Sequence, residues 1–407
     1  MNIQSKIFKL KGKVQNYAWG GYDYIPSLLG FDNKEHKPCA EYWMGAHPSA
    51  SSLLVTESDS TLLYELIKQN PSSTITDGVY KKFGELPYLF KILDVKDMLS
   101  IQVHPSKEEA IKGFEREEAE GILINASNRN YKDKNHKPEV MVALSEFWLL
   151  HGFKQTAQLE RVLEDIQEFN ILLPLFRKEG CKSLYQFVMQ MEPNEVDALL
   201  APLVKRELTR KQSNELTKEM PGWWVAKLFE GKEDYKNIDK GVFSIYFFNI
   251  VKIEKGEAIF QAAGIPHAYL EGQNVELMAN SDNVLRAGLT PKHIDVPELM
   301  KHTLFKGIVP NVMKGNKATN SVERNFPCPV PDFGLSVIEL TEKTKYTALS
   351  TSLEILIATE GGGVINGTSV NLLIKQGEAV AILPGEDYSI ESSGNLTIFK
   401  AFVPQNA

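Results

Sequence analysis

The chain has 407 residues and a formal net charge of −7, and 43% of its residues are hydrophobic, 10% aromatic and 24% charged. This composition is typical of a globular protein with a sizeable core, and the length predicts two or three compact units. Because the chain is acidic and has no basic run, nucleic acid is not an expected partner. A local pair of cationic side chains can still hold a phosphate in such a protein.

The cysteines and the apolar segments indicate a cytoplasmic protein. Cys39, Cys181 and Cys328 are far apart and odd in number, which argues against a disulfide framework and for a reducing compartment. The N-terminal segment carries charges throughout and lacks the apolar core of a signal peptide. The longest apolar stretch, at 242–251, is too short to span a bilayer. We therefore expect a cytoplasmic location and no membrane partner.

The first part of the chain consists of short strand-like pieces broken by Gly, Pro and Asn, and one of them, LSIQVH, has an unusual polar face. In an extended chain its three apolar residues alternate with Ser100, Gln102 and His104, whose side chains therefore point the same way. A proline ends this predicted strand. A short helix is predicted to begin at Ser106, because Ser106 and Glu109 have the spacing of a capping box.

Residues 155–235 change to a helical period. Apolar residues recur at spacings of three and four between Leu159 and Phe169, with Thr156 as the predicted N-cap. More helical pattern follows in SLYQFVMQM and EVDALLAPLVKREL. This segment is therefore predicted to be a helical insertion.

A β pattern returns at about residue 241 and continues to the end of the chain. Asn366 and Gly367 are predicted to form a two-residue hairpin turn. A Gly-Glu-Ala turn occurs at 256–258 and again at 377–379, and each copy is followed by a proline at the end of a predicted strand. The repeat predicts two related jelly-roll units.

Two further segments place polar residues beside apolar strands. Pro138 holds Lys137 in an extended conformation, so Lys137 and Glu139 share a face. A plain salt bridge explains such a pair equally well. Taken singly, the polar residues of the segment 264–295 are explained by core hydrogen bonds or ion pairs. They include His267, Glu276, Asp282, Arg286 and Lys292.

Four residues from these segments form a set with two ring nitrogens and two oxygens: Gln102, His104, Glu139 and His267. Such a set suits zinc with a place left for substrate or water, and its mixed hardness also admits manganese, cobalt or iron(II). A dioxygenase that gathers its metal ligands in a compact H-x-H cluster is disfavoured, because the chain has no H-x-H motif.

The segments at 15–20, 40–50, 86–106, 135–144 and 266–292 are long and unusual in composition. Together, and in this order, they resemble the type I mannose-6-phosphate isomerases (phosphomannose isomerases) of the cupin superfamily. With this resemblance we expect a mainly β fold with a helical insertion. The expected parts are a catalytic cupin jelly roll at 1–154 plus 241–320, the insertion at 155–240, and a smaller C-terminal cupin-like β domain at 321–407.

The resemblance implies a zinc-dependent isomerase that interconverts mannose 6-phosphate and fructose 6-phosphate through an enediol. It implies one zinc ion per chain, bound by Gln102, His104, Glu139 and His267. It assigns Arg286 as the active-site arginine and places Lys137, Glu276 and Asp282 in the pocket. The identity of the catalytic base stays open among these last three. The residues expected to bind substrate are Trp19, Lys91, Ser100, His136 and Lys292.

Two alternatives remain open at the level of the sequence. The first is a non-catalytic cupin that binds a sugar phosphate, and the second is an isomerase of a different sugar phosphate. A bifunctional isomerase–pyrophosphorylase would need a Gly-rich nucleotide loop near the N-terminus, and the sequence has none. The expected partner is a small sugar phosphate, and we expect a monomer or a weak homo-oligomer.

Overall fold

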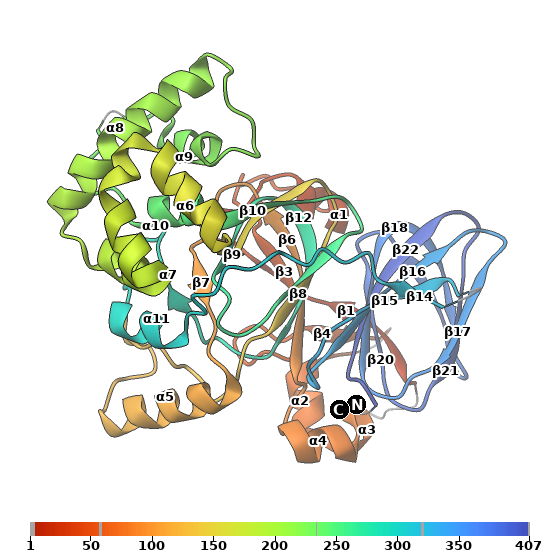
Figure 1. The fold of residues 1–407 in the computed structure, drawn as a ribbon. Coiled ribbons are helices and arrows are strands. Elements are labelled where there is room, and N and C mark those ends of the chain that lie inside the picture. The colour runs from red at the N-terminus through yellow and green to blue at the C-terminus, as the bar shows by residue number, and fades with distance from the viewer. Residues whose placement is uncertain (1–4, 57–58, 233, 319–320, 406–407) are drawn as a thin grey trace.

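The computed structural model describes residues 5–56, 59–232, 234–318 and 321–405. It has two antiparallel β-sheets that lie side by side, and a helical lobe covers the end of the first sheet that is remote from the second (Figure 1). This arrangement agrees with the predicted mainly β fold with a helical insertion.

The first sheet is built around its longest strand, β12 (His267–Ala279), which pairs with β6 (Tyr88–Val95), β7 (Gln102–Val103), β8 (Glu139–Ala143) and β9 (Phe147–Phe153). Strands from distant parts of the chain thus pair with one central strand. The other strands of this sheet are β2 (Lys13–Gln15), β3 (Glu41–Gly45), β10 (Phe248–Ile253), β11 (Ala258–Gln261) and β13 (Leu285–Arg286).

The second sheet contains the C-terminal strands together with three strands from the N-terminal part of the chain. They are β1 (Ile7–Lys11), β4 (Leu53–Val55), β5 (Ser60–Leu62), β14 (Asn316–Lys317), β15 (Glu323–Phe326), β16 (Gly334–Leu340), β17 (Lys345–Leu349), β18 (Glu354–Asn366), β19 (Asn371–Lys375), β20 (Ala379–Ile382), β21 (Asp387–Glu391) and β22 (Leu396–Phe402). Because β1 pairs with β20, the predicted catalytic and C-terminal domains share a sheet. The predicted domain boundaries therefore stay a prediction.

The helical lobe packs on the first sheet through a large apolar cluster. Trp148 and Phe153 of β9 contact the lobe, whose buried side chains include Leu163, Phe169 and Trp224. The helices are α1 (Tyr24–Leu29), α2 (Leu63–Gln69), α3 (Pro71–Ile75), α4 (Asp77–Phe83), α5 (Lys107–Ala119), α6 (Thr156–Asp165), the 3₁₀ helix η1 (Gln167–Leu172), α7 (Leu173–Gln190), α8 (Pro193–Gln212), α9 (Pro221–Phe229), α10 (Gly241–Phe247) and α11 (Val296–His302). Among the described residues, none of these helices is long and apolar enough to cross a membrane.

Several predictions about local structure are confirmed. Helix α5 begins where expected, and the Ser106 hydroxyl accepts a hydrogen bond from the Glu109 N–H. Helices α7 and α8 contain the two helical segments expected after residue 173. Cys39, Cys181 and Cys328 are free.

Other local predictions are wrong. The N-cap of α6 is Gln155 rather than Thr156. Asn366 pairs with Asn371, so the hairpin loop has four residues, and the Gly367 N–H donates to the Val370 carbonyl. The β pattern expected from residue 241 begins with α10, because a wholly buried apolar run has no period that separates helix from strand.

The predictions also failed for short elements. The strand expected over LSIQVH is reduced to Gln102 and Val103, although Leu99 and Ile101 still donate backbone hydrogen bonds to neighbouring segments. The four helices α1 to α4 were not predicted. Each has only five to seven residues, which gives too few turns for an apolar period to show.

The main core lies between the two sheets. Phe90, Val142 and Leu277 of the first sheet pack in the same apolar cluster as Ile355 and Phe399 of the second. Because side chains alternate along a strand, the neighbours of these core residues in the first sheet must point to the opposite face. That opposite face carries the candidate site.

Candidate metal centre and active site

The alternation of side chains brings an unusual set of charged residues to one face of the first sheet. Glu276 of β12 is in register with Lys91 of β6, and Lys91 is in register with Trp43 of β3. Glu139 opens β8 on the same face, because Val140 and Val142 point into the core between the sheets. The sequence of each strand therefore alternates between the core and this polar face.

Three buried residues on this face converge on one point. The Nε2 atom of His104 lies 3.4 Å from Oε1 of Glu139, and the Nε2 atom of His267 lies 3.3 Å from Oε2 of Glu139. One ligand atom from each of the three residues lies within 4.8 Å of the others. The distances are those of ligands grouped around one ion, and His/Glu chemistry suits zinc.

Backbone carbonyls fix the two imidazole rings. Nδ1 of His104 lies 2.9 Å from the carbonyl oxygen of Asn283, and Nδ1 of His267 lies 2.9 Å from that of Ile265. A carbonyl accepts but does not donate, so each Nδ1 carries the proton and each Nε2 presents a lone pair toward Glu139. Although His104 is buried, its Nε2 has no hydrogen-bond partner among the described residues, which fits a metal ligand.

The electrostatics favour the protonation states that a metal requires. Burial, with a further effect of Lys137, lowers the pKa of His104 to about 4, so its ring is neutral. Burial alone would raise the pKa of Glu139, but Lys137 and His104 outweigh burial and hold that pKa well below its ordinary value. Lys137 Nζ lies 2.8 Å from Glu139 Oε1. A neutral imidazole and an ionised carboxylate are the forms that bind zinc.

Gln102 lies beside this cluster. In the short strand β7 it is in register with His267 on one side and with Arg286 on the other. Its position as a neighbour of His267 is compatible with the expected fourth ligand, and that role stays a prediction.

A cavity of about 710 Å³ opens over the polar face. Its volume is in the range of small-molecule sites. The residues predicted for the site that line it are Trp19, Lys91, Ser100, Gln102, Lys137, Asp282, Arg286 and Lys292. His104, Glu139, His267 and Glu276 lie outside this lining and are buried.

Lys91 lines one wall of the cavity and belongs to a buried cluster of ion pairs. Its Nζ lies 3.0 Å from Glu276 Oε2 and 3.4 Å from Glu41 Oε2, and 5.2 Å from the centre of the Trp43 ring. Tyr269 donates a 2.8 Å hydrogen bond to the other oxygen of Glu276. Burial raises the pKa of Glu276, and Lys91 opposes that shift. Both oxygens of Glu276 are engaged by side chains, which favours a supporting role over that of a base.

Asp282 differs from Glu276, because it lines the cavity and its side chain is partly exposed. His47 Nε2 lies 3.4 Å from Asp282 Oδ2, and the hydrogen bond from His47 lowers the pKa of Asp282. The carboxylate is therefore ionised and open to a substrate at neutral pH. His47 acts here as a supporting residue for Asp282.

His136 makes a contact with the C-terminal part of the chain. It is outside the cavity lining, and its Nε2 lies 3.0 Å from both carboxylate oxygens of Asp332. Asp332 is buried and comes from the C-terminal part of the chain. The ring is therefore directed to that contact, and the expected binding of substrate by His136 stays a prediction.

Cations gather at one end of the cavity. Arg286, Lys292 and Lys132 all line it, and none of the three forms an ion pair with another described residue. Burial lowers the pKa of Arg286, and burial followed by the charges of Arg286 and Lys132 lowers the pKa of Lys292. Unpaired cations in a cavity attract an anion such as a phosphate.

Sequence reasoning missed Glu41, Trp43 and Lys132. The first two alternate with the core residues Tyr42 and Met44, so the strand period of EYWMG contained the necessary signal. Lys132 had no such signal, because its place in the cavity depends on a loop.

The comparisons with known proteins agree with this site. A family model described as the catalytic domain of type I phosphomannose isomerase matches residues 7–156. The mannose-6-phosphate isomerase of Escherichia coli strain K12 is 37% identical over 394 residues, which cover 95% of this chain and 98% of that protein. The chain belongs to the type I phosphomannose isomerase family.

Other members of this family extend the match to eukaryotes and to solved structures. The mannose-6-phosphate isomerase of Macaca fascicularis is 32% identical over 430 residues, which cover 97% of this chain and 98% of that protein. A crystal structure of the Salmonella typhimurium enzyme with fructose 6-phosphate and zinc has a TM-score of 0.86 and 35% identity, and covers 98% of this chain and 100% of that one. The cupin-type fold expected for the family is thereby confirmed.

Asn283 connects the metal centre to the cation end of the cavity. Its carbonyl accepts from His104, its Oδ1 accepts from the Lys132 N–H at 2.7 Å, and its Nδ2 donates to the Asp133 carbonyl at 2.8 Å. We expect Asn283→Ala to weaken zinc binding by about 10–100-fold. Without the side-chain hydrogen bonds of Asn283, its backbone carbonyl would no longer be held in place to orient the His104 ring. The free energy of unfolding should fall by about 1–3 kcal/mol, because buried backbone groups lose partners.

Zinc affinity by chelator competition and stability by denaturant titration test this prediction separately. Asn280→Ala is the matched control, because the Asn280 side chain donates one hydrogen bond, to Glu85, and forms none with His104 or Lys132. Wild-type zinc affinity in Asn283→Ala would contradict the positioning role.

Proposed function

We propose that the chain interconverts mannose 6-phosphate and fructose 6-phosphate with one bound zinc ion. The observation that carries the proposal is a single cavity with a buried His/Glu/His cluster behind one wall and unpaired cations at one end. The His/Glu/His cluster suits a metal ion that stabilises negative charge on the sugar oxygens. The unpaired cations suit the binding of a phosphate. The curated relatives are isomerases of this substrate.

The reaction requires an open-chain sugar, transfer of a proton between C2 and C1, and stabilisation of negative charge on the sugar oxygens. When bound, the zinc ion supplies Lewis-acid stabilisation of that charge. His104, Glu139 and His267 would hold it, with Gln102 as the proposed fourth ligand. The chain's own residues must then bind the phosphate and move the proton.

Arg286 and Lys292 are proposed to bind the phosphate, because both line the cavity without a carboxylate partner among the described residues. The planar guanidinium of Arg286 can hold two phosphate oxygens at once, or one of the oxygens on which charge develops. The proton carrier must reach the reacting carbons. Asp282 and Lys137 line the cavity, whereas Glu276 does not, so the first two are the proposed candidates for the base.

The remaining expectations concern the surroundings of the enzyme. We propose a cytoplasmic monomer or weak homo-oligomer, in keeping with the three free cysteines. Gel filtration with light scattering tests the oligomeric state.

Turnover before and after metal removal tests the proposed function. We expect the purified protein to convert mannose 6-phosphate to fructose 6-phosphate, to lose this activity on chelation, and to regain it with zinc but not with magnesium, which prefers oxygen ligands. No turnover in folded, zinc-loaded protein would favour the non-catalytic cupin. Turnover of another aldose phosphate in preference to mannose 6-phosphate would favour the isomerase of a different substrate.

A further inference from the structure

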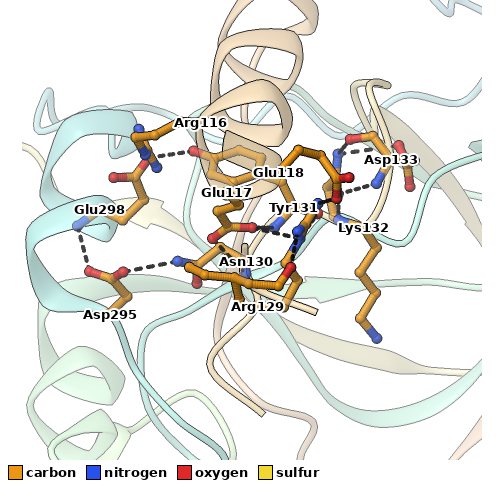
Figure 2. A network of polar contacts seen from close by, with 12 residues as sticks. Arg116, Glu117, Glu118, Arg129, Asn130, Tyr131, Lys132, Asp133, Asp295 and Glu298 are labelled. Carbon is orange, nitrogen blue, oxygen red and sulfur yellow. Dashed lines mark hydrogen bonds and ion pairs between the residues drawn. The ribbon is translucent and has the colours of Figure 1, made fainter. Parts of the chain in front are cut away.

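The loop that carries Lys132 is held by a buried polar network (Figure 2). Glu117 of α5 accepts hydrogen bonds from the backbone N–H groups of Asn130 at 3.1 Å and Tyr131 at 2.9 Å. The same carboxylate lies 2.9 Å from Nε of Arg129, whose guanidinium is buried. A buried glutamate that receives two backbone donors and one cation fixes the path of the chain immediately before Lys132.

The loop is also fixed on its other side. The Tyr131 hydroxyl donates a 2.6 Å hydrogen bond to Glu298 of α11, and Asn130 Nδ2 donates to Asp295 at 2.9 Å. The Lys132 N–H itself donates to the buried Asn283 side chain. The backbone of Lys132 is therefore held from α5, from α11 and from the connection between β12 and β13.

The Lys132 side chain takes no part in this network. In Figure 2 it extends away from the other labelled residues, and no ion pair joins its amino group to them. It lines the cavity that contains Arg286 and Lys292. Lys134, two residues further on, contrasts with it, because its Nζ lies 2.8 Å from Glu115 Oε1 and it is outside the cavity lining.

The charges that line the cavity favour the binding of an anion close to Lys132. Its charge and that of Arg286 both act on Lys292, so Lys292 is repelled by two cations. Asp282 is an acidic group near them. The hydrogen bond from His47 has the largest effect in lowering its pKa, and Lys137 and Lys132 lower it further, so this one carboxylate is shared among several cations. A loop that holds the unpaired Lys132 close enough to act on Lys292 costs free energy unless a bound anion offsets the repulsion.

We propose that Lys132 is a third phosphate-binding residue, which makes the site select phosphorylated over unphosphorylated sugars. The proposal rests on the proposed function, since it assigns a further contact to the same substrate. Because the contact is made to the phosphate and not to the reacting carbons, it contributes equally to the bound substrate and to the transition state. Its loss should therefore raise KM and leave kcat nearly unchanged.

Lys132→Gln in the zinc-loaded protein tests the proposal, with Lys134→Gln as the matched control that removes the same charge from the same loop. For Lys132→Gln we expect KM for mannose 6-phosphate and the dissociation constant of inorganic phosphate to rise about tenfold, with kcat changed by less than about threefold. Lys134→Gln should match the wild type, and Lys132→Arg should recover most of the phosphate affinity.

Calorimetry with inorganic phosphate keeps this test independent of turnover. If the wild type binds phosphate but does not isomerise mannose 6-phosphate, the proposed function fails while the comparison of Lys132→Gln with Lys134→Gln still decides the role of Lys132. Equal phosphate affinity and KM in the two variants would overturn the assignment. A fall in kcat at unchanged KM would also overturn it, because that result places Lys132 at the reacting end.

Discussion

Glu139→Gln is expected to abolish stoichiometric zinc binding and to lower turnover by at least about 10³-fold. The carboxylate of Glu139 lies between the Nε2 atoms of His104 and His267 and also pairs with Lys137. An amide keeps the size of the side chain but removes the negative charge that attracts the metal. Metal content by atomic emission and turnover with mannose 6-phosphate measure the two effects.

Loss of the charge also leaves Lys137 without its carboxylate partner, so some destabilisation must be separated from loss of the metal. Glu354→Gln is the control, because Glu354 is a buried strand glutamate of the second sheet that accepts a 2.6 Å hydrogen bond from Tyr388, far from the cavity. It should keep full zinc content and turnover. A zinc-replete and active Glu139→Gln enzyme would remove Glu139 from the metal centre.

The metal cluster could be predicted because local patterns picked out candidate ligands, and the resemblance of the surrounding segments then assigned them to one set. The period of two placed Gln102 and His104 together, and Pro138 placed Lys137 on the face of Glu139. The structure brings His104, Glu139 and His267 together, and it also contains the Lys137–Glu139 ion pair that was the simpler explanation of the same pattern. The two explanations are compatible, because Oε1 of Glu139 lies near both Lys137 and His104.

The parts that could not be predicted depend on pairing between distant segments. The pairing of β1 with β20 brings an N-terminal strand into the sheet formed by the C-terminal strands. No local sequence pattern indicates this pairing. The contact of His136 with Asp332 joins residues that are 196 positions apart. The resemblance of the segment around His136 therefore could not predict this contact. The same holds for Lys132, whose place in the cavity is set by partners on α5, on α11 and at Asn283.

The site therefore has two kinds of residue with different physical origins. The residues of the polar face, such as Lys91 and Glu276, follow from strand alternation and are in register on one sheet. The cations at the other end follow from loops and from the short strand β13, and among described residues they lack acidic partners. We propose that the substrate supplies such partners, and Arg286 is a half-buried member of this group.

Arg286→Ala is expected to lower kcat/KM for mannose 6-phosphate by about 10²–10³-fold at normal zinc content, because a guanidinium held in a partly desolvated cavity forms strong charge-assisted hydrogen bonds. Arg286→Lys should recover only part of this loss, since an ammonium keeps the charge but cannot present the planar fork. Arg177→Ala is the control, because Arg177 is exposed in the helical lobe and pairs with Glu160 and Glu164. If Arg286→Ala kept near-normal turnover with a full complement of zinc, the cation end of the cavity would have to act through Lys132 and Lys292 alone.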